Sequence, residues 1–198
     1  DVGWSITLPE VQYLDSVPTK VGSALPVLEL GLVFPKSFVW LAGDYERING
    51  SNYADQLIGN SFDNTIVGED GDDILDGGKG ADTLNGGAGN DVLYLGSDDD
   101  IDRVIFTDIT ESVTGSLRDK IYEFNSEDLI DLSLIDANIA EEGDQAFAYT
   151  ADPQANALWV ILSGGDLILH GDVDGDITPD FEIMLVGVTA FSSDNLVA

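Results

Sequence analysis

The stretch GEDGDDILDGGKGADTLNGGAGNDVLY, from Gly68 to Tyr94, decides the fold of this protein. It combines glycine and aspartate at a density that neither a helix nor an ordinary strand tolerates, because glycine is conformationally free and like charges repel. Its leucines, in contrast, recur every nine residues, at Leu75, Leu84 and Leu93. The segment therefore needs an internal repeat to build its core and a counter-charge to hold its turns.

The nine-residue register extends to both sides of this stretch. Blocks that start at Gly50 carry glycine in first place, at Gly50, Gly59, Gly68, Gly77 and Gly86. The sixth place holds Asp55, Asn64, Asp73, Asp82, Asp91 and Asp100. The eighth place holds Leu57, Ile66, Leu75, Leu84 and Leu93, after which the register fails at Asp102. A repeat of constant period predicts a solenoid in which each block is one structural unit.

Each place in the block has a physical role. The glycines allow a tight turn with inward carbonyls, the sixth residue supplies a carboxylate, and the last three residues form a short strand with one aliphatic side chain inside. Two blocks make one coil, so turns two blocks apart stack and a cation can lie between them. Several oxygen ligands in a flexible arrangement favour Ca²⁺ over Zn²⁺ or Mg²⁺. The pattern resembles G-G-x-G-x-D-x-U-x of calcium-binding RTX proteins, which implies an all-β fold built on a parallel β-roll.

The composition limits the partners. The chain of 198 residues has 38 acidic against 7 basic residues, a net charge of −31, and no cysteine. Nucleic acid and anionic membrane surfaces are unfavourable partners for such a charge, and neither disulfides nor thiolate metal sites can form. The longest apolar stretch is interrupted by Glu29, so we expect no membrane insertion. Multivalent cations, several Ca²⁺ ions here, are the natural counterpart.

Three regions follow from the pattern. Residues 50–103 form the RTX roll. Residues 1–49 and 104–198 read as strands, which include WSITL, PVLEL and SFVWLAG before the roll and RVIFTDI, KIYEF, ALWVIL, DLILHG and EIMLVGV after it. We expect the first region to be a β-rich segment that packs on the roll, and the last to be a β-sandwich-like cap.

From about Gly50 to Ala198 the chain resembles the C-terminal region of the serralysin-type secreted metalloproteases. The resemblance rests on the repeat and on DKIYEFNSEDLIDLSLIDA, GDQAFAY, GDVDGDITPDFEI and the ending DNLVA. It implies a calcium-bound β-roll, a C-terminal cap at 104–198 and a C-terminal signal read by type I (ABC) secretion machinery. It therefore also implies an extracellular location, with cell-surface association as a variant.

The resemblance also implies the calcium ligands. In the family, carbonyls from the second and fourth places of one turn meet carbonyls from the first and third places of the next turn on that side, and both turns add their sixth-place side chains. The implied sets pair Glu69, Gly71 and Asp73 with Gly86, Ala88 and Asp91; Asn60, Phe62 and Asn64 with Gly77, Lys79 and Asp82; Gly78, Gly80 and Asp82 with Leu95, Ser97 and Asp100; and Ser51, Tyr53 and Asp55 with Gly68, Asp70 and Asp73. Gly87, Gly89 and Asp91 then need an outside carboxylate, for which the candidates are Asp119 and Asp128.

DVDGDITPD is a separate candidate. Asp172, Asp174, Asp176 and Asp180 fall at the first, third, fifth and ninth places of a calcium loop. Ile177 replaces the sixth-place glycine, which disfavours the sharp turn. An acidic turn without metal is the alternative.

No catalytic machinery is expected in this chain. His170 is the only histidine, so a His-Glu-x-x-His zinc site cannot be assembled, and no Gly-x-Ser-x-Gly motif is present. We expect His170 on a strand face near the surface. The same roll and cap also occur behind lipases, epimerases, adhesins and surface-layer proteins, so fold alone leaves the activity of the parent protein open.

The sequence thus favours a non-catalytic module that is disordered in low-calcium cytosol and folds on calcium after export. One alternative is a calcium-bridged adhesion or surface-layer module with a cell-surface or matrix partner. Another is the C-terminal part of a secreted hydrolase whose catalytic domain lies upstream.

Overall fold

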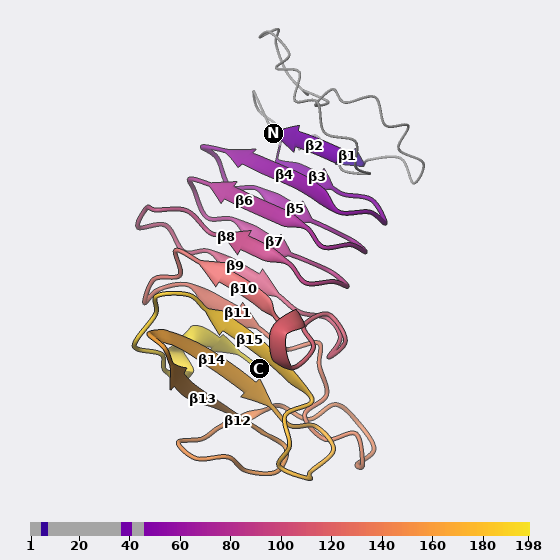
Figure 1. Ribbon diagram of the computed structural model, residues 1–198, viewed down its shortest axis with the longest axis vertical. Helices are drawn as coiled ribbons and strands as arrows, with labels where there is room; N and C mark the ends of the chain where they lie inside the picture. The colour runs from indigo at the N-terminus through magenta and orange to yellow at the C-terminus, as the bar shows by residue number, and fades with distance from the viewer. Residues whose placement is uncertain (1–4, 8–36, 41–45) are drawn as a thin grey trace, which may run out of the picture.

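The computed structural model describes residues 5–7, 37–40 and 46–198, and in this part of the chain the protein is all-β (Figure 1). Its only helical elements there are two 3-10 turns, η1 at Gly115–Leu117 and η2 at Ser193–Asn195. The predicted fold class is confirmed. The predicted strand PVLEL lies outside the described residues. None of the described residues forms a helix long and apolar enough to cross a membrane.

Two sheets face each other along the molecule (Figure 1). The first is 7-stranded, and its neighbours all pair in parallel. In spatial order it contains β1 (Ser5–Thr7), β3 (Arg47–Asn49), β5 (Thr65–Val67), β7 (Thr83–Asn85), β9 (Arg103–Ile105), β11 (Leu129–Asp131) and β16 (Leu196–Val197).

The second sheet is 9-stranded and mixed. Its order is β12 (Ala148–Tyr149), β13 (Ala157–Ser163), β14 (Asp166–Gly171), β15 (Phe181–Leu185), β10 (Asp119–Tyr122), β8 (Val92–Tyr94), β6 (Ile74–Gly78), β4 (Asp55–Asn60) and β2 (Ser37–Trp40). Only the β13–β14 and β14–β15 pairs are antiparallel. From β3 to β11 successive strands alternate between the two sheets, which is the path of a β-roll.

The strand register explains why the repeat folds in this way. In one sheet Leu57, Leu75, Leu93 and Ile121 lie opposite one another on successive strands. In the other sheet the same holds for Ile48, Ile66, Leu84, Val104 and Ile130. All of these side chains are fully buried. One aliphatic side chain per short strand therefore builds the core of the roll, because alternate residues on a strand point to opposite faces.

The last coil of the repeat departs from the nine-residue period. After Leu93 the next buried aliphatic in the strand register is Val104, in β9, and the turn between the two strands runs through residues 95–102. Compared with an ordinary block, this turn contains two extra residues. Asp102 therefore precedes the strand by one position, the place that Asp82 has before Thr83.

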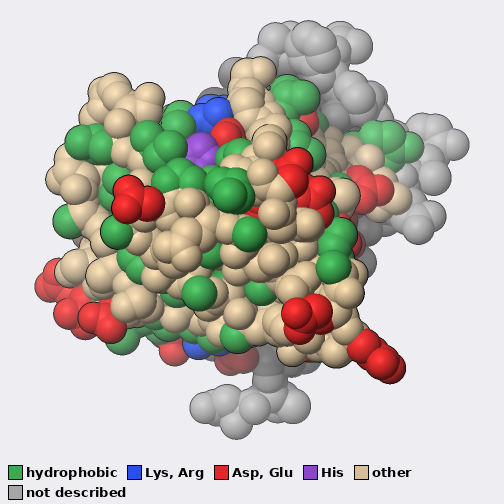
Figure 2. Space-filling view, turned by 90° about the horizontal axis from the view of Figure 1, so that it is seen from below, with side chains coloured by type: hydrophobic (Ala, Val, Ile, Leu, Met, Phe, Trp, Pro, Cys, Tyr) green, Lys and Arg blue, Asp and Glu red, His purple; other side chains and the backbone are tan. Residues whose placement is uncertain are grey.

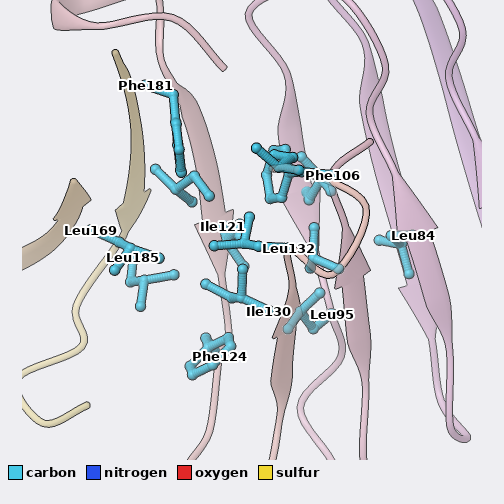
Figure 3. Packing of buried hydrophobic residues seen from close by; sticks show 14 of the residues in the cluster. Leu84, Leu95, Phe106, Ile121, Phe124, Ile130, Leu132, Leu169, Phe181 and Leu185 are labelled. Carbon is cyan, nitrogen blue, oxygen red and sulfur yellow. The ribbon is translucent and has the colours of Figure 1, made fainter. Parts of the chain in front are cut away.

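Both sheets continue without interruption beyond the repeat. β10 pairs with β8 on one side and β15 on the other, and β11 pairs with β9 and β16. The core also continues, with Leu95, Phe106, Leu132 and Phe181 among the buried residues between the sheets (Figure 3). The end of the molecule that Figure 2 shows from below presents both acidic and apolar side chains. Ile161 and Leu162 of β13 are exposed apolar residues.

Candidate metal centre

One side of the roll carries a ladder of aspartates. The stack places the sixth residues of successive turns one above another, so each carboxylate accepts from the backbone N–H of the residue above. Asp73 Oδ1 accepts from Asp55 at 2.6 Å, Asp91 Oδ1 from Asp73 at 2.8 Å, and Asp119 Oδ1 from Asp91 at 2.9 Å. The predicted candidate Asp119 thus lies directly next to Asp91.

The opposite side carries a second ladder. Asp82 Oδ1 accepts from the Asn64 N–H at 2.7 Å, Asp102 Oδ1 from Asp82 at 2.8 Å, and Asp128 Oδ1 from Asp102 at 3.0 Å. Asp128 therefore continues this second ladder. The sequence offers it, with Asp119, as a candidate ligand beside Asp91, and only Asp119 lies there. The two candidates lie on different ladders because β10 and the turn at residues 123–128 add one more coil below the repeat.

Each ladder leaves carboxylate oxygens without a partner. The Oδ2 atoms of Asp73, Asp82, Asp91, Asp102 and Asp119 are buried and accept no hydrogen bond. Buried polar atoms in native proteins are almost always paired, so each of these oxygens requires an explanation. The first turn differs, since Ser51 donates to Asp55 Oδ2 from both its backbone N–H, at 2.7 Å, and its hydroxyl, at 2.9 Å.

The surroundings of the ladder aspartates disfavour their ionised form. Burial raises the pKa of Asp73, Asp82 and Asp119 to about 8, and that of Asp91 and Asp102 to about 7. Repulsion from neighbouring carboxylates adds to the effect on these pKa values, while the hydrogen bonds from backbone N–H groups lower them. The pKa of Asp128 is raised in the same way. A cation between the rungs relieves both causes, because it solvates the carboxylate and cancels the repulsion.

Carbonyl oxygens converge on the same places. A Cβ atom added to Gly68 would overlap both Asp73 Oδ2 and the carbonyl oxygen of Gly86. Cβ atoms on Gly87 and Gly89 would overlap the carbonyl oxygens of Glu69 and Gly71. The carbonyl oxygens of Glu69 and Gly71 therefore lie directly against the glycines of the next turn. Only glycine leaves room for that approach. The two turns are also joined by backbone hydrogen bonds, from Ala88 N–H to Glu69 O at 2.9 Å and from Gly71 N–H to Ala88 O at 2.8 Å.

The other predicted sets are assembled to different degrees. In the set on the opposite side, Cβ atoms on Gly59 and Gly78 would overlap the carbonyl oxygens of Gly77 and Asn60, and the Lys79 N–H donates to Asn60 O at 2.9 Å. In the set that contains Ser51, Tyr53 and Asp55, a Cβ on Gly50 would overlap Gly68 O, and Gly71 packs against the Tyr53 backbone. Asp70 of the same set forms an isolated parallel β-bridge with Ala88. Tyr53 and Phe62 take glycine places but turn their side chains outward, with 42% and 53% of their surface exposed.

The set that includes Leu95, Ser97 and Asp100 is only partly assembled. Leu95 O and Asp82 Oδ2 both lie within 3 Å of a Cβ built on Gly77, and Gly80 packs against the Phe62 backbone. Asp100, however, is exposed, and Asp102 takes the ladder position. The two extra residues in the turn are the reason. The strand triplet Arg103–Ile105, with its aliphatic centre, is the signal in the sequence from which Asp102 could have been found.

The separate acidic loop is also formed. Carboxylate oxygens of Asp172, Asp174 and Asp176 lie within 4.8 Å of one another. Ile177 adopts a positive φ of 69° and Gly175 one of 83°, so the sharp turn forms in spite of the isoleucine. Unlike the ladder aspartates that keep an unpartnered Oδ2, Asp172 has protein donors at both carboxylate oxygens. Asn156 N–H and Gly175 N–H reach its Oδ1 at 2.9 and 2.8 Å, and Ile177 N–H reaches its Oδ2. Asp180 Oδ2 accepts from Val173 N–H at 2.7 Å, and the Thr178 N–H binds Asp176 Oδ1 at 2.6 Å.

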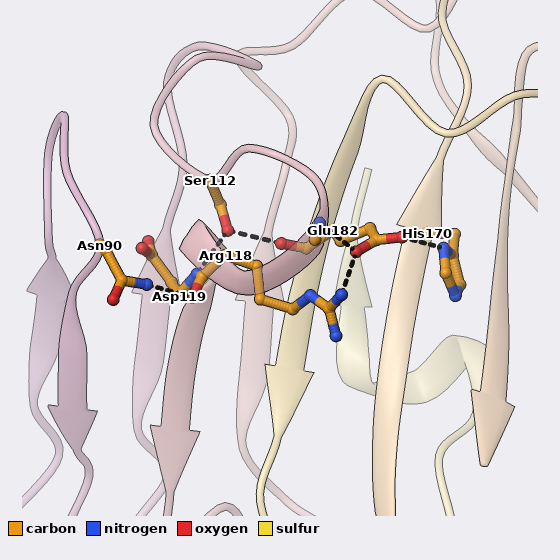
Figure 4. Close-up of polar contacts among 7 residues, drawn as sticks. Asn90, Ser112, Arg118, Asp119, His170 and Glu182 are labelled. Atoms are coloured by element: carbon orange, nitrogen blue, oxygen red, sulfur yellow. Dashed lines mark hydrogen bonds and ion pairs between the residues drawn. The ribbon is translucent and has the colours of Figure 1, made fainter. Parts of the chain in front are cut away.

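A polar network connects the end of the first ladder to β14 and β15 (Figure 4). Ser112 Oγ accepts from Asp119 N–H at 2.9 Å and donates to Glu182 O at 2.5 Å. The Glu182 carboxylate contacts Arg118 at 2.7 Å and His170 Nδ1 at 3.2 Å. His170 was expected near the surface, but it is 93% buried because its ring stacks on Trp159 of the neighbouring strand.

The donor set fits calcium. Carboxylate and carbonyl oxygens from two flexible turns are the ligands that Ca²⁺ takes, and the described part of each turn offers no sulfur or imidazole. The regular turns on both sides repeat this arrangement, with Glu69, Gly71 and Asp73 above Gly86, Ala88 and Asp91 as the most complete case.

Comparisons with known proteins agree with this geometry. Residues 49–84 and 68–102 match the family described as RTX calcium-binding nonapeptide repeat (4 copies). Curated protein sequences give no match to the chain. The solution structure of the AlgE6R2 subunit from the Azotobacter vinelandii mannuronan C5-epimerase is 29% identical, with a TM-score of 0.57, over 77% of this chain and 92% of that one. The AlgE6R3 subunit of the same enzyme is 30% identical, with a TM-score of 0.54, over 75% of this chain and 80% of that one. Residues 49–102 are therefore RTX calcium-binding nonapeptide repeats, and the chain is a calcium-binding RTX repeat module similar in structure to these two subunits.

Proposed function

We propose that this chain is a calcium-dependent folding and secretion module of an extracellular protein. One observation carries the proposal: five ladder aspartates each keep a buried oxygen without a partner. Without a cation, folding at neutral pH buries repelling carboxylates or forces them to take up protons. With Ca²⁺ between the turns, the same atoms become ligands and the arrangement is stable.

The magnitude of this effect is comparable to the stability of a whole domain. An ion present at a hundredfold excess over its dissociation constant stabilises the folded state by about 2.7 kcal/mol. Extracellular modules bind calcium at roughly 10⁻⁴–10⁻³ M. A few such ions match the usual stability of about 5–15 kcal/mol outside the cell, and at submicromolar cytosolic calcium their contribution nearly vanishes.

Export before folding is consistent with the position of the C-terminus. We infer that DNLVA acts as the signal for a type I (ABC) exporter, as the serralysin-like cap at 104–198 implies. In the folded chain these last residues are bound to the rest of the protein. Leu196–Val197 pairs with β11, and the Asn195 side chain donates to Ser126 O and Asp128 O, each at 3.0 Å. An exporter that reads these residues therefore has to reach them before the roll forms.

Circular dichroism of the purified chain tests the folding switch. We expect a disordered spectrum in chelator and a β spectrum after addition of Ca²⁺, with Mg²⁺ much less effective at the same concentration. Identical spectra in chelator and in calcium would rule the proposal out.

The comparisons favour a role within a larger enzyme. The two similar subunits belong to a mannuronan C5-epimerase. We propose that this chain likewise serves a catalytic domain located elsewhere in its parent protein, with residues 1–49 packing on the roll at 50–103 and the loop of Asp172, Asp174, Asp176 and Asp180 as an additional calcium site. Calcium-bridged attachment to a cell surface or matrix is the alternative. Calcium-dependent binding to cells by the isolated chain would favour attachment, and a purified chain inert toward cells would favour the enzyme module.

A further inference from the structure

The turn with two extra residues, 95–102, contains a carboxylate that the nine-residue pattern does not place. The Oδ1 atom of Asp98 accepts from the Asp100 N–H at 3.0 Å, while its Oδ2 is buried and has no hydrogen-bond partner. Asp99 and Asp100, the neighbouring acids in the same turn, are exposed. Of this acidic run, Asp98 is the residue whose carboxylate points inward.

The surroundings of Asp98 are oxygen atoms of the stacked turn at 77–82. A Cβ built on Gly96 would overlap the Gly78 carbonyl oxygen and lie 3.6 Å from Asp98 Oδ2. One residue earlier in each turn, a Cβ built on Gly77 would overlap Asp82 Oδ2 and lie 2.8 Å from the Leu95 carbonyl oxygen. Two carbonyl and two carboxylate oxygens thus lie where the turns 77–82 and 95–102 approach each other.

Independent evidence for a ligand comes from Asp82 and Asp102. Each is 99% buried, and each keeps an unpartnered Oδ2. Several like charges around one gap need a cation, and Lys79, the basic residue of the turn 77–82, is exposed.

We propose that Asp98, and not Asp100, supplies the carboxylate that completes a Ca²⁺ site between turns 77–82 and 95–102, together with Asp82 and the carbonyls of Gly78 and Leu95. The two extra residues then have a role: they displace the sixth-place carboxylate to Asp102 for the ladder and bring a second carboxylate to the ion. This proposal rests on the proposed calcium function and specifies one of its sites.

A matched pair of substitutions tests the assignment. Asp98→Asn keeps an oxygen to accept from Asp100 N–H but removes the charge, and Asp100→Asn removes the same charge from an exposed position two residues away. Native mass spectrometry and calorimetric titration of the full chain with Ca²⁺ alone count the ions and give their affinities. Because calcium affinity depends on the number of charged ligands, we expect Asp98→Asn to weaken one ion by about tenfold or more and Asp100→Asn to change every affinity by less than about twofold.

Asp98→Glu, which restores the charge, controls for a loss of folding and should recover the ion that Asp98→Asn loses. Equal ion counts and affinities for Asp98→Asn and the unchanged chain would overturn this assignment and leave the proposed function intact. The same holds if Asp100→Asn weakens an ion as much as Asp98→Asn does. A chain that binds no Ca²⁺ at all would overturn both proposals.

Discussion

The repeat region and the C-terminal strands solve the burial of acidic groups in different ways. In the roll, Asp73 and Asp91 keep buried oxygens that have no hydrogen-bond partner. Around β13–β15, the buried Glu182 faces Arg118, and Asp172 is surrounded by backbone N–H donors. The two regions share one continuous pair of sheets, yet only the C-terminal one balances its buried charge with its own atoms.

Their apolar cores differ as well. Each strand of the roll contributes one aliphatic side chain, such as Leu75 or Leu84, whereas the C-terminal region adds aromatic contacts, with the Phe147 and Phe181 rings 5.9 Å apart and edge-on. Aromatic side chains bury far more surface per residue. The roll combines a core of small buried area with unbalanced charge, so we expect its folding to depend on a bound ion. The C-terminal strands should depend on that ion mainly through their contact with β10.

Removal of calcium gives the largest expected difference between the two regions. Amide hydrogen exchange as free Ca²⁺ is lowered should show that β4–β8 lose protection first, at a higher calcium concentration than β13–β15. The reason is that only the roll loses its counter-charge. Simultaneous loss of protection in both regions at one calcium concentration would show that they form a single cooperative unit, and the comparison would then fail.

Asp91→Asn tests the ladder at its centre. The amide keeps an oxygen for the Asp73 N–H but removes the charge, so in saturating Ca²⁺ we expect a loss of about 2–3 kcal/mol in the free energy of unfolding, the contribution of one bound ion. In chelator the same change removes a buried repelling charge, so the β content should stay equal or rise. Denaturant unfolding in calcium and circular dichroism in chelator measure this reversal.

Asp166→Asn is the matched control for that experiment. Asp166 lies in β14 and accepts from Gly187 N–H at 2.8 Å, outside the ladders. Its substitution should change stability by the same small amount with and without calcium. A calcium-dependent effect equal to that of Asp91→Asn would mean that the result reflects net charge and not the ladder.

The sequence predicted the roll well and the irregular coil poorly, for a physical reason. Glycine, aspartate and leucine places are each required by turn, ligand and core, so Gly68, Asp73 and Leu75 follow directly from the repeat. The turn at 95–102 breaks the period, and counting alone then selects Asp100 over Asp102. Which residue enters the ladder is decided by the pairing of Arg103 with Thr83, a tertiary contact.

The same limit applies to His170 and Ile177. Alternation along β14 does not reveal that Trp159 covers His170, because the cover comes from the partner strand. Ile177 adopts a backbone conformation that isoleucine disfavours, and the N–H bonds to Asp172 and Asp176 around it hold that turn. The stacking of Trp159 on His170 is a contact between strands, which no local pattern contains.

Arg118→Met tests the charge balance of the C-terminal region. It leaves the Glu182 carboxylate without its cation at a site where both side chains are at least 85% buried. We expect a loss of about 1–3 kcal/mol that does not depend on calcium concentration. Arg103→Met is the comparison: its ion pair with Asp131 is 3.2 Å long and the arginine side chain is 42% exposed, so the loss should stay below about 1 kcal/mol.

The pH dependence of the metal-free roll is the most specific of these effects. The unfolded chain releases its aspartate protons near the ordinary pKa of 3.8, whereas folded Asp73 and Asp82 hold theirs up to about 8 and Asp91 up to about 7. Between these limits the folded state binds more protons, so in chelator its stability should rise as pH falls from about 8 to about 5.5. In saturating Ca²⁺ the ladder carboxylates are ionised in both states, and stability should be nearly constant over this range. The β content by circular dichroism in chelator, and unfolding curves in calcium, measure the two pH dependences at several pH values. Asp91→Asn should weaken the first because one titrating aspartate is gone. The same pH dependence under both conditions would mean that calcium does not bind at the ladders.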